Sequence, residues 1–194
     1  ALTQAGHRVV LVDALQAGAQ MVPDFDGRSY AIAHASHRLL AALGLWEGLA
    51  DKAQPMLDIK VSDGRAGTGP ASPFFLHFDH AEIEEGPMGF MGEDRHLRSA
   101  LQRALADAPN LTLIHGARVT AQDTAGPLAR VTLSDGQTLQ ARVLVGCDGR
   151  GSGTAVRAGI KRMAWVYGQT ALASAIAHER PHHGVAHQFF MPAG

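Results

Sequence analysis

The sequence contains 194 residues, of which 46% are hydrophobic, and its 17 basic and 18 acidic residues leave a formal net charge of −1. No basic block interleaved with aromatic residues occurs, which argues against a nucleic-acid partner, and no apolar run reaches the roughly 18 residues of a membrane-spanning helix. The single cysteine, Cys147, excludes an internal disulfide and favours a reducing compartment, so we expect a cytoplasmic protein.

Both ends of the sequence resemble interrupted elements. Ala1–Ala5 is typical of the last turns of a helix, which Gly6 is suited to end. Residues 189–194 are typical of a strand that leads onward. We therefore expect an internal piece of a longer protein.

An apolar run that ends in an acid follows at residues 8–13. This pattern predicts the second strand of a dinucleotide-binding βαβ unit, with Asp13 placed to accept a hydrogen bond from a ribose hydroxyl. The G-x-G-x-x-G turn of the complete motif is not in this sequence, so any αβ unit with a surface aspartate fits the run equally well.

Apolar residues at helical spacing predict the first helix, which Gly44 is placed to end. These residues are Ile32, Ala35, Leu39, Leu40 and Leu43. Residues 45–49 are predicted to continue as a short helical turn. Arg28, in the loop before the helix, is suited to contact a phosphate, although a solvated loop charge is the commoner role of such an arginine.

Two strands then interrupt the α/β pattern. Residues 57–62 alternate between apolar and polar, as in a half-exposed strand, and residues 74–78 form an aromatic-rich run. No helix of a βαβ unit separates them, so we expect an antiparallel sheet.

A clear amphipathic helix comes next. Its apolar face is formed by Leu97, Leu101 and Leu105, with Asp94 placed to cap its start and Pro109 to close it. A strand is predicted at residues 111–115 directly afterwards.

A β-meander is predicted from three short runs at residues 119–123, 129–134 and 138–140. Asp135-Gly136 lies between the last two of them and is typical of a two-residue hairpin turn.

The stretch at residues 142–157 carries the strongest local signal for a ligand. Val143–Val145 predicts a buried strand, Asp148-Gly149 an acidic glycine turn, and residues 154–158 the start of a helix. Such a turn lets the backbone and a carboxylate approach a ribose or ribityl group. A purely structural turn, in which Asp148 caps the helix, is the competing interpretation.

Two more strands are expected at residues 165–176 and 185–191, joining the strands at 57–62 and 74–78. Four histidines cluster between them, in HERPHHGVAH at residues 178–187. Their spacing resembles that of metal ligands, but no cysteine or carboxylate pattern accompanies it, so we expect a solvated hairpin loop and no metal site.

Five segments together resemble the flavin-dependent aromatic hydroxylases of the para-hydroxybenzoate hydroxylase type. Within that family they are most similar to the ubiquinone-biosynthesis hydroxylases of the 2-octaprenyl-6-methoxyphenol hydroxylase branch. The segments are QAGHRVVLVDA, FDGRSYAIAHAS, GEDRHLRSALQRAL, LVGCDGRGS and YGQTALASAI. The resemblance runs through essentially the whole chain.

The resemblance implies an FAD site made by residues far apart in the sequence. It places Asp13 at the adenosine ribose, and Arg28 and Arg95 against the FAD. It also implies that Asp148 and Gly149 contact FAD and lie along the path by which NAD(P)H approaches. No residue of the chain is assigned as an acid–base catalyst.

The implied function is that of an FAD-dependent monooxygenase that hydroxylates a polyprenylated phenol ring in ubiquinone biosynthesis. NAD(P)H would reduce the FAD, and the reduced flavin would capture O2 as a C4a-hydroperoxide. Other ubiquinone-biosynthesis proteins and peripheral contact with the inner membrane are the implied associations. A flavin hydroxylase of another aromatic compound, or a flavin-free fragment or scaffold subunit, is the alternative.

The fold class predicted from all of these signals is α/β. A Rossmann-like FAD-binding domain at residues 1–55 and 89–161 is interleaved with a mostly antiparallel substrate-binding sheet at residues 56–88 and 162–194. Both domains are expected to be incomplete in this chain.

Overall fold

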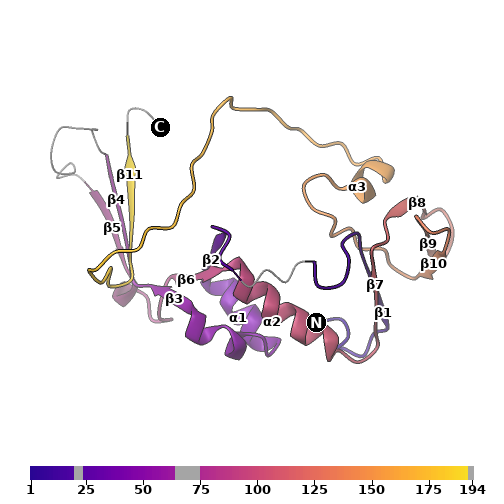
Figure 1. The fold of residues 1–194 in the computed structure, drawn as a ribbon, viewed down its shortest axis with the longest axis horizontal. Helices are drawn as coiled ribbons and strands as arrows, with labels where there is room; N and C mark the ends of the chain where they lie inside the picture. The colour runs from indigo at the N-terminus through magenta and orange to yellow at the C-terminus, as the bar shows by residue number, and fades with distance from the viewer. Residues whose placement is uncertain (20–23, 64–74, 192–194) are drawn as a thin grey trace. The chain divides into compact units, whose positions relative to one another are not determined.

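The structure is a computed structural model that describes residues 1–19, 24–63 and 75–191 (Figure 1). The chain divides into two compact units, each made of two separate segments. The first unit comprises Ala1–Gln20 and Ala108–Leu172, and the second Met21–Asp107 and Ala173–Gly194.

The predicted domain boundaries differ from these units, because residues 24–55 and 89–107 group with the second unit. The division into an FAD-binding domain and a substrate-binding domain stays a prediction.

The first unit contains the predicted parallel pair. Strand β1 (Val9–Asp13) lies parallel to β7 (Leu111–His115), with Val9 opposite Leu111 and Asp13 opposite His115. Both strands were predicted from their apolar runs, and both are confirmed. The pairing places Asp13 at the carboxyl end of the pair, where open parallel sheets bind ligands.

The β-meander of the first unit is also confirmed. It consists of β8 (Val119–Asp123), β9 (Ala129–Leu133) and β10 (Thr138–Ala141), all antiparallel in the order β10-β9-β8. The predicted two-residue turn is wrong: the connection covers residues 134–136, because Leu133 N donates to Gln137 O at 2.8 Å. Gly136, at φ +86°, takes the left-handed position that a three-residue hairpin needs.

One hydrophobic cluster stabilises the first unit. Its buried members are Ala117, Val131 and Leu133, and the Leu133 side chain is only 1% exposed. Partly buried side chains from both sheets and from the following segment pack against them. These are Val12, Ile114, Val119, Leu139 and Leu144. The cluster therefore joins the meander to the parallel pair.

The predicted buried strand at Val143–Val145 is wrong for this structure. The segment is irregular, and the side chains of Val143 and Val145 are 71% and 62% exposed. A strand forms only when its backbone N–H and C=O groups pair with a neighbour, and β1 and β7 pair only with each other within the described ranges. The helix predicted after the glycine turn is confirmed as α3 (Gly153–Arg157).

The predicted strand at residues 165–176 is wrong for the same reason. The segment has no regular structure, and Val166 and Leu172 are 94% and 96% exposed. The histidine-rich residues 178–184 are consequently a turn that leads into a strand, not the loop of a hairpin.

The second unit contains a sheet that the sequence analysis missed. It has the order β2-β6-β3, formed by β2 (Ser29–Ala33), β6 (Gly89–Glu93) and β3 (Ala53–Met56), all antiparallel. Glycine and proline have low strand propensity, which hides β6 and β3 from a pattern search. Gly89 is required in the central strand, since a Cβ there would lie 2.5 Å from the Ile32 carbonyl oxygen.

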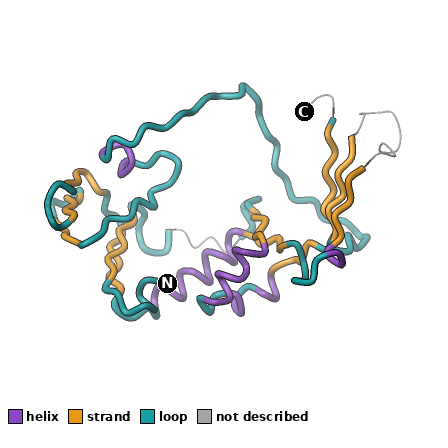
Figure 2. The backbone as a smooth tube through the Cα atoms, turned by 180° about the vertical axis from the view of Figure 1, so that it is seen from behind, coloured by secondary structure: helices purple, strands orange, loops and turns teal. Residues whose placement is uncertain are grey.

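Two helices contact this sheet, as the tube in Figure 2 shows. They are α1 (His34–Ala42) and α2 (Asp94–Ala106). The same unit also contains the short 3₁₀ helices η1 (Trp46–Gly48), η2 (Ala50–Lys52) and η3 (His80–Glu82). The predicted first helix begins later than expected, because Ile32 belongs to β2. The His37 ring joins α1 to the sheet, with centroid distances of 4.3 Å to Trp46 and 4.8 Å to Phe90.

A second sheet of this unit has the order β11-β4-β5. Strand β4 (Asp58–Asp63) is antiparallel to β5 (Phe75–Asp79) and parallel to β11 (Val185–Phe190). The three predicted strands are confirmed, although Phe74, predicted to begin one of them, lies outside the described residues. In the part of the chain that the structure describes, no helix has the length and apolar character needed to cross a membrane.

Candidate functional site

The glycine turn predicted to contact a cofactor holds the start of α3. One carboxylate oxygen of Asp148 accepts a hydrogen bond from the Ser152 hydroxyl. The other accepts from the Thr154 backbone N–H at 2.9 Å and from its hydroxyl at 3.0 Å. Ser152 is itself the N-cap, because its hydroxyl oxygen accepts from Ala155 N at 3.0 Å. Asp148 therefore supports the first turn of α3 through Ser152 and Thr154, although the N-cap is Ser152 and not Asp148, and its contact with FAD stays a prediction.

These hydrogen bonds stabilise the charged form of the carboxylate. The Ser152 hydroxyl, followed by the Thr154 backbone N–H, holds the pKa of Asp148 well below its ordinary value of 3.8. A lowered pKa in the folded state means that the carboxylate stabilises the fold above the unfolded pKa and loses that contribution as the pH falls.

We expect the pH dependence of stability to reveal this carboxylate. The melting temperature of Asp148→Asn should lie below that of the wild type at pH 7, and the two values should converge as the pH falls below about 4. Thr154→Val removes one of the three donors and keeps the side-chain shape, so its difference from the wild type should be smaller. A difference for Asp148→Asn that is constant from pH 7 to pH 3 would contradict the role of the charge.

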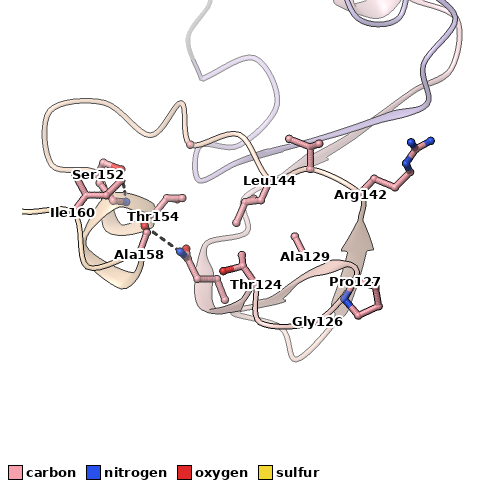
Figure 3. A pocket seen from close by; sticks show the side chains of 14 residues that line it. Thr124, Gly126, Pro127, Ala129, Arg142, Leu144, Ser152, Thr154, Ala158 and Ile160 are labelled. Carbon is pink, nitrogen blue, oxygen red and sulfur yellow. Dashed lines mark hydrogen bonds between the residues drawn. The ribbon is translucent and has the colours of Figure 1, made fainter.

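A cavity of about 420 Å³ lies beside this turn (Figure 3). Its walls come from the β8–β9 loop, residues 142–146 and α3. Gln122 connects β8 to α3 by two hydrogen bonds. Its Nε2 donates to Thr154 O at 3.1 Å, and its Oε1 accepts from Arg157 Nε at 3.2 Å. Gly146 permits the close approach, because a Cβ at that position would lie 2.9 Å from the Thr154 side chain.

Asp13 and Gly149 belong to the same unit as Asp148. The Asp13 carboxylate accepts from Leu15 N at 2.9 Å, which orients it at the end of β1. Gly149 has φ +77°, a left-handed conformation that favours glycine. Both positions are compatible with the predicted cofactor contacts, which stay predictions.

The second unit contains a buried carboxylate that sequence reasoning assigned wrongly. Asp94 was predicted to cap α2, but the N-cap is Glu93, and its side chain makes no capping bond. Asp94 is 4% exposed, and its carboxylate accepts from the Tyr30 hydroxyl at 2.9 Å and from Arg98 Nε at 2.5 Å. Arg28 Nη2 completes the set at 3.1 Å from Asp94 Oδ2. We call Arg28, Tyr30, Asp94 and Arg98 the Asp94 network.

Arg28 is held by a second carboxylate as well. Its Nε donates to Asp26 Oδ2 at 2.8 Å, and its Nη2 pairs with the same oxygen. This contact raises the pKa of Arg28 and lowers that of Asp26. Nη1 makes no hydrogen bond to any residue in the described ranges, and the side chain is 48% exposed. Arg28 therefore presents a fixed guanidinium with free donors.

Arg95 follows Asp94 on α2 and faces a different partner. Its Nε donates to Glu93 Oε2 at 2.6 Å, and its side chain is 31% exposed. The second unit thus carries Arg28 and Arg95, whereas the other predicted cofactor residues lie in the first unit. The sequence offered one signal for the Asp94 network, the i,i+4 spacing of Asp94 and Arg98, which permits an ion pair on a helix.

Groups of metal-binding side chains are absent from the part of the chain that the structure describes. No three His, Cys, Asp or Glu side chains there lie as a metal site would need.

A sequence model of one family, described as an FAD binding domain, matches residues 1–190. The chain belongs to this family. The FAD-binding family predicted from the sequence is thereby confirmed, since residues 1–190 cover nearly all of the chain.

Proteins similar to this chain include ubiquinone hydroxylases. Ubiquinone hydroxylase UbiL of Rhodospirillum rubrum is 46% identical over 196 residues, an alignment that covers 100% of this chain and 44% of the relative. The 3-demethoxyubiquinol 3-hydroxylase of Escherichia coli is 29% identical, with 100% of this chain and 48% of the relative covered. The chain therefore spans less than half the length of these relatives.

Solved structures agree with the fold. A variant of PqsL from Pseudomonas aeruginosa matches with a TM-score of 0.67 and 21% identity, covering 84% of this chain and 42% of that protein. The p-nitrophenol 4-monooxygenase PnpA from Pseudomonas putida matches with a TM-score of 0.64 and 19% identity, covering 81% and 39%. The mixed α/β fold predicted from the sequence is confirmed over this partial length.

Proposed function

We propose that the full-length protein is an FAD-dependent monooxygenase that hydroxylates a polyprenylated phenol in ubiquinone biosynthesis, with NAD(P)H as the electron donor and O2 as co-substrate. The observation that carries the proposal is the 46% identity to a ubiquinone hydroxylase along the whole of this chain. The substrate class and the donor come from that likeness and from the five segments that resemble the aromatic hydroxylases.

The residues present fit the cofactor. FAD carries an anionic pyrophosphate, and the half-exposed Arg28 offers N–H groups of the kind that bind phosphate oxygens. Asp13 ends a parallel strand, where a carboxylate accepts from ribose hydroxyls. When bound, FAD supplies the redox chemistry, and these side chains bind and orient it. Arg95, Asp148 and Gly149 complete the proposed contacts.

The proposal assigns cofactor binding and substrate binding to two interleaved domains. The parallel pair β1–β7 supports a Rossmann-like FAD-binding domain, and the sheet β11-β4-β5 supports a separate substrate domain. Phe78 and Phe190 are 50% and 57% exposed on that sheet, which suits an apolar polyprenyl chain. A substrate of this kind lies in a membrane, so we propose a cytoplasmic protein with peripheral contact at the inner membrane, beside other ubiquinone-biosynthesis proteins.

The test is to purify the full-length protein and record its flavin absorption spectrum and its NAD(P)H oxidation with and without a polyprenylphenol. Deletion of the gene in its host should then cause a polyprenylated quinone precursor that lacks one ring hydroxyl to accumulate. A full-length protein that takes up no flavin on reconstitution would favour a scaffold subunit. Normal quinone levels in the deletion strain would favour another aromatic substrate.

A further inference from the structure

We infer that Asp94 is a positioning residue for the cofactor: its buried carboxylate holds the Arg28 guanidinium ready for an anionic oxygen of FAD. The inference rests on the proposed function, because Arg28 is the FAD contact in that proposal. Arg28, Tyr30, Asp94 and Arg98 all lie in the second unit, within one compact part of the chain.

Burial makes the Asp94 carboxylate depend on its partners. A carboxylate that is 4% exposed is costly unless it is paired and hydrogen-bonded. The Asp94 network meets this need with hydrogen bonds from Tyr30 and Arg98 and an ion pair with Arg28. Arg98 alone, four residues along the same helix, would provide an ion pair. Arg28 lies in the segment before β2, and Tyr30 lies in β2 itself. Their contacts with the carboxylate therefore also connect that segment to α2.

The main chain of Asp94 also contacts the loop that carries Arg28. Asp94 N donates to the Arg28 carbonyl oxygen at 3.0 Å, so the main chain and the side chain of Asp94 both contact Arg28. Tyr30, which binds the other carboxylate oxygen, is two residues further along β2. The loop that carries Arg28 is therefore fixed at two points to the first turn of α2.

Two carboxylates hold the Arg28 guanidinium in its orientation. The contacts to Asp26 and Asp94 use Nε and Nη2, and Nη1 is left without a partner among the described residues. An arginine whose fork is already fixed loses less side-chain entropy when it binds an anion. Asp26 lies only two residues away, in the same exposed loop, and its side chain is 34% exposed. Asp94 is thus the only one of the two carboxylates that connects Arg28 to regular structure.

The experiment measures FAD dissociation constants on full-length apoprotein by quenching of flavin fluorescence. We expect Asp94→Ala to raise the dissociation constant about tenfold and Asp94→Asn, which keeps the shape and one acceptor, to raise it less. In an Arg28→Ala background, Asp94→Ala should cause little further change, because the residue it positions is gone. Asp107→Ala, at the other end of α2, is the matched control and should bind FAD like the wild type.

The outcomes separate the inference from the proposed function. Equal weakening by Asp94→Ala with and without Arg28 would overturn the positioning role, since a general loss of structure does not depend on Arg28. If Arg28→Ala weakens binding and neither Asp94 variant does, the inference fails and the proposed function stands. If the wild-type protein binds no FAD, both fail. Should Asp94→Ala not fold, the same comparisons are made with Asp94→Asn.

Discussion

Replacing Leu133 with alanine is expected to lower the free energy of unfolding of the first unit by about 2–5 kcal/mol. Leu133 is 1% exposed and lies in the cluster with Ala117 and Val131, against which side chains of β1, β7 and β10 pack. Truncation removes buried methyl groups and leaves a cavity between the meander and the parallel pair. Because the cluster joins these two sheets, the loss should affect the whole unit rather than one hairpin.

The measurement is urea unfolding of the protein followed by circular dichroism. Leu128→Ala is the matched control, since Leu128 precedes the same strand and is 42% exposed, so its change should stay within about 0.5 kcal/mol. Equal destabilisation by the two substitutions would show that Leu133 is not the centre of the core of this unit.

Replacing Arg28 with alanine is expected to weaken FAD binding by about 10- to 100-fold in the full-length protein, the range for loss of a hydrogen bond to a charged group. The side chain is held by Asp26 and Asp94, and its Nη1 makes no hydrogen bond within the described ranges, which matches an anionic oxygen of the cofactor. The substitution also removes the Arg28–Asp94 ion pair and leaves the buried carboxylate with Tyr30 and Arg98, so the apoprotein should melt at a lower temperature.

Two further variants isolate the contribution of the guanidinium. Arg28→Lys keeps the charge and loses the fork, so its FAD dissociation constant should lie between those of the wild type and Arg28→Ala. Arg38→Ala removes an exposed arginine from α1 in the same unit and should leave FAD binding unchanged. Wild-type affinity in Arg28→Ala would identify Arg28 as a solvated loop charge, the alternative that the sequence also allowed.

Local patterns explain which elements were predictable. The runs that became β1, β7 and the meander combine apolar periodicity with turn residues close in sequence, so each signal lies within a few residues of the element it predicts. The amphipathic helix α2 was predictable for the same reason. The short strands β3 and β6 carry proline or glycine, and their pairing depends on neighbours distant in the chain.

The candidate site was predictable in part. Position and residue type indicated Asp13, Arg28 and the Asp148-Gly149 turn, whereas Arg95 was implied only by the resemblance to the aromatic hydroxylases. The roles of all five residues toward FAD stay predictions. The sequence contained no sign that Tyr30 binds Asp94, because the two residues are 64 positions apart. Asp148 shows the opposite case, since its partners Ser152 and Thr154 are so close in sequence that a capping role was already one of two interpretations.

The sequence by itself therefore determined the family, the strands with a clear local period and the acidic turn before α3. Only the tertiary structure decided that Val143–Val145 and residues 165–176 are exposed and irregular, and that Asp94 is buried among cations. The physical reason is that periodicity reports what a segment is able to bury. Whether a segment forms a strand, or whether a carboxylate is buried, depends on hydrogen-bond partners from other parts of the chain.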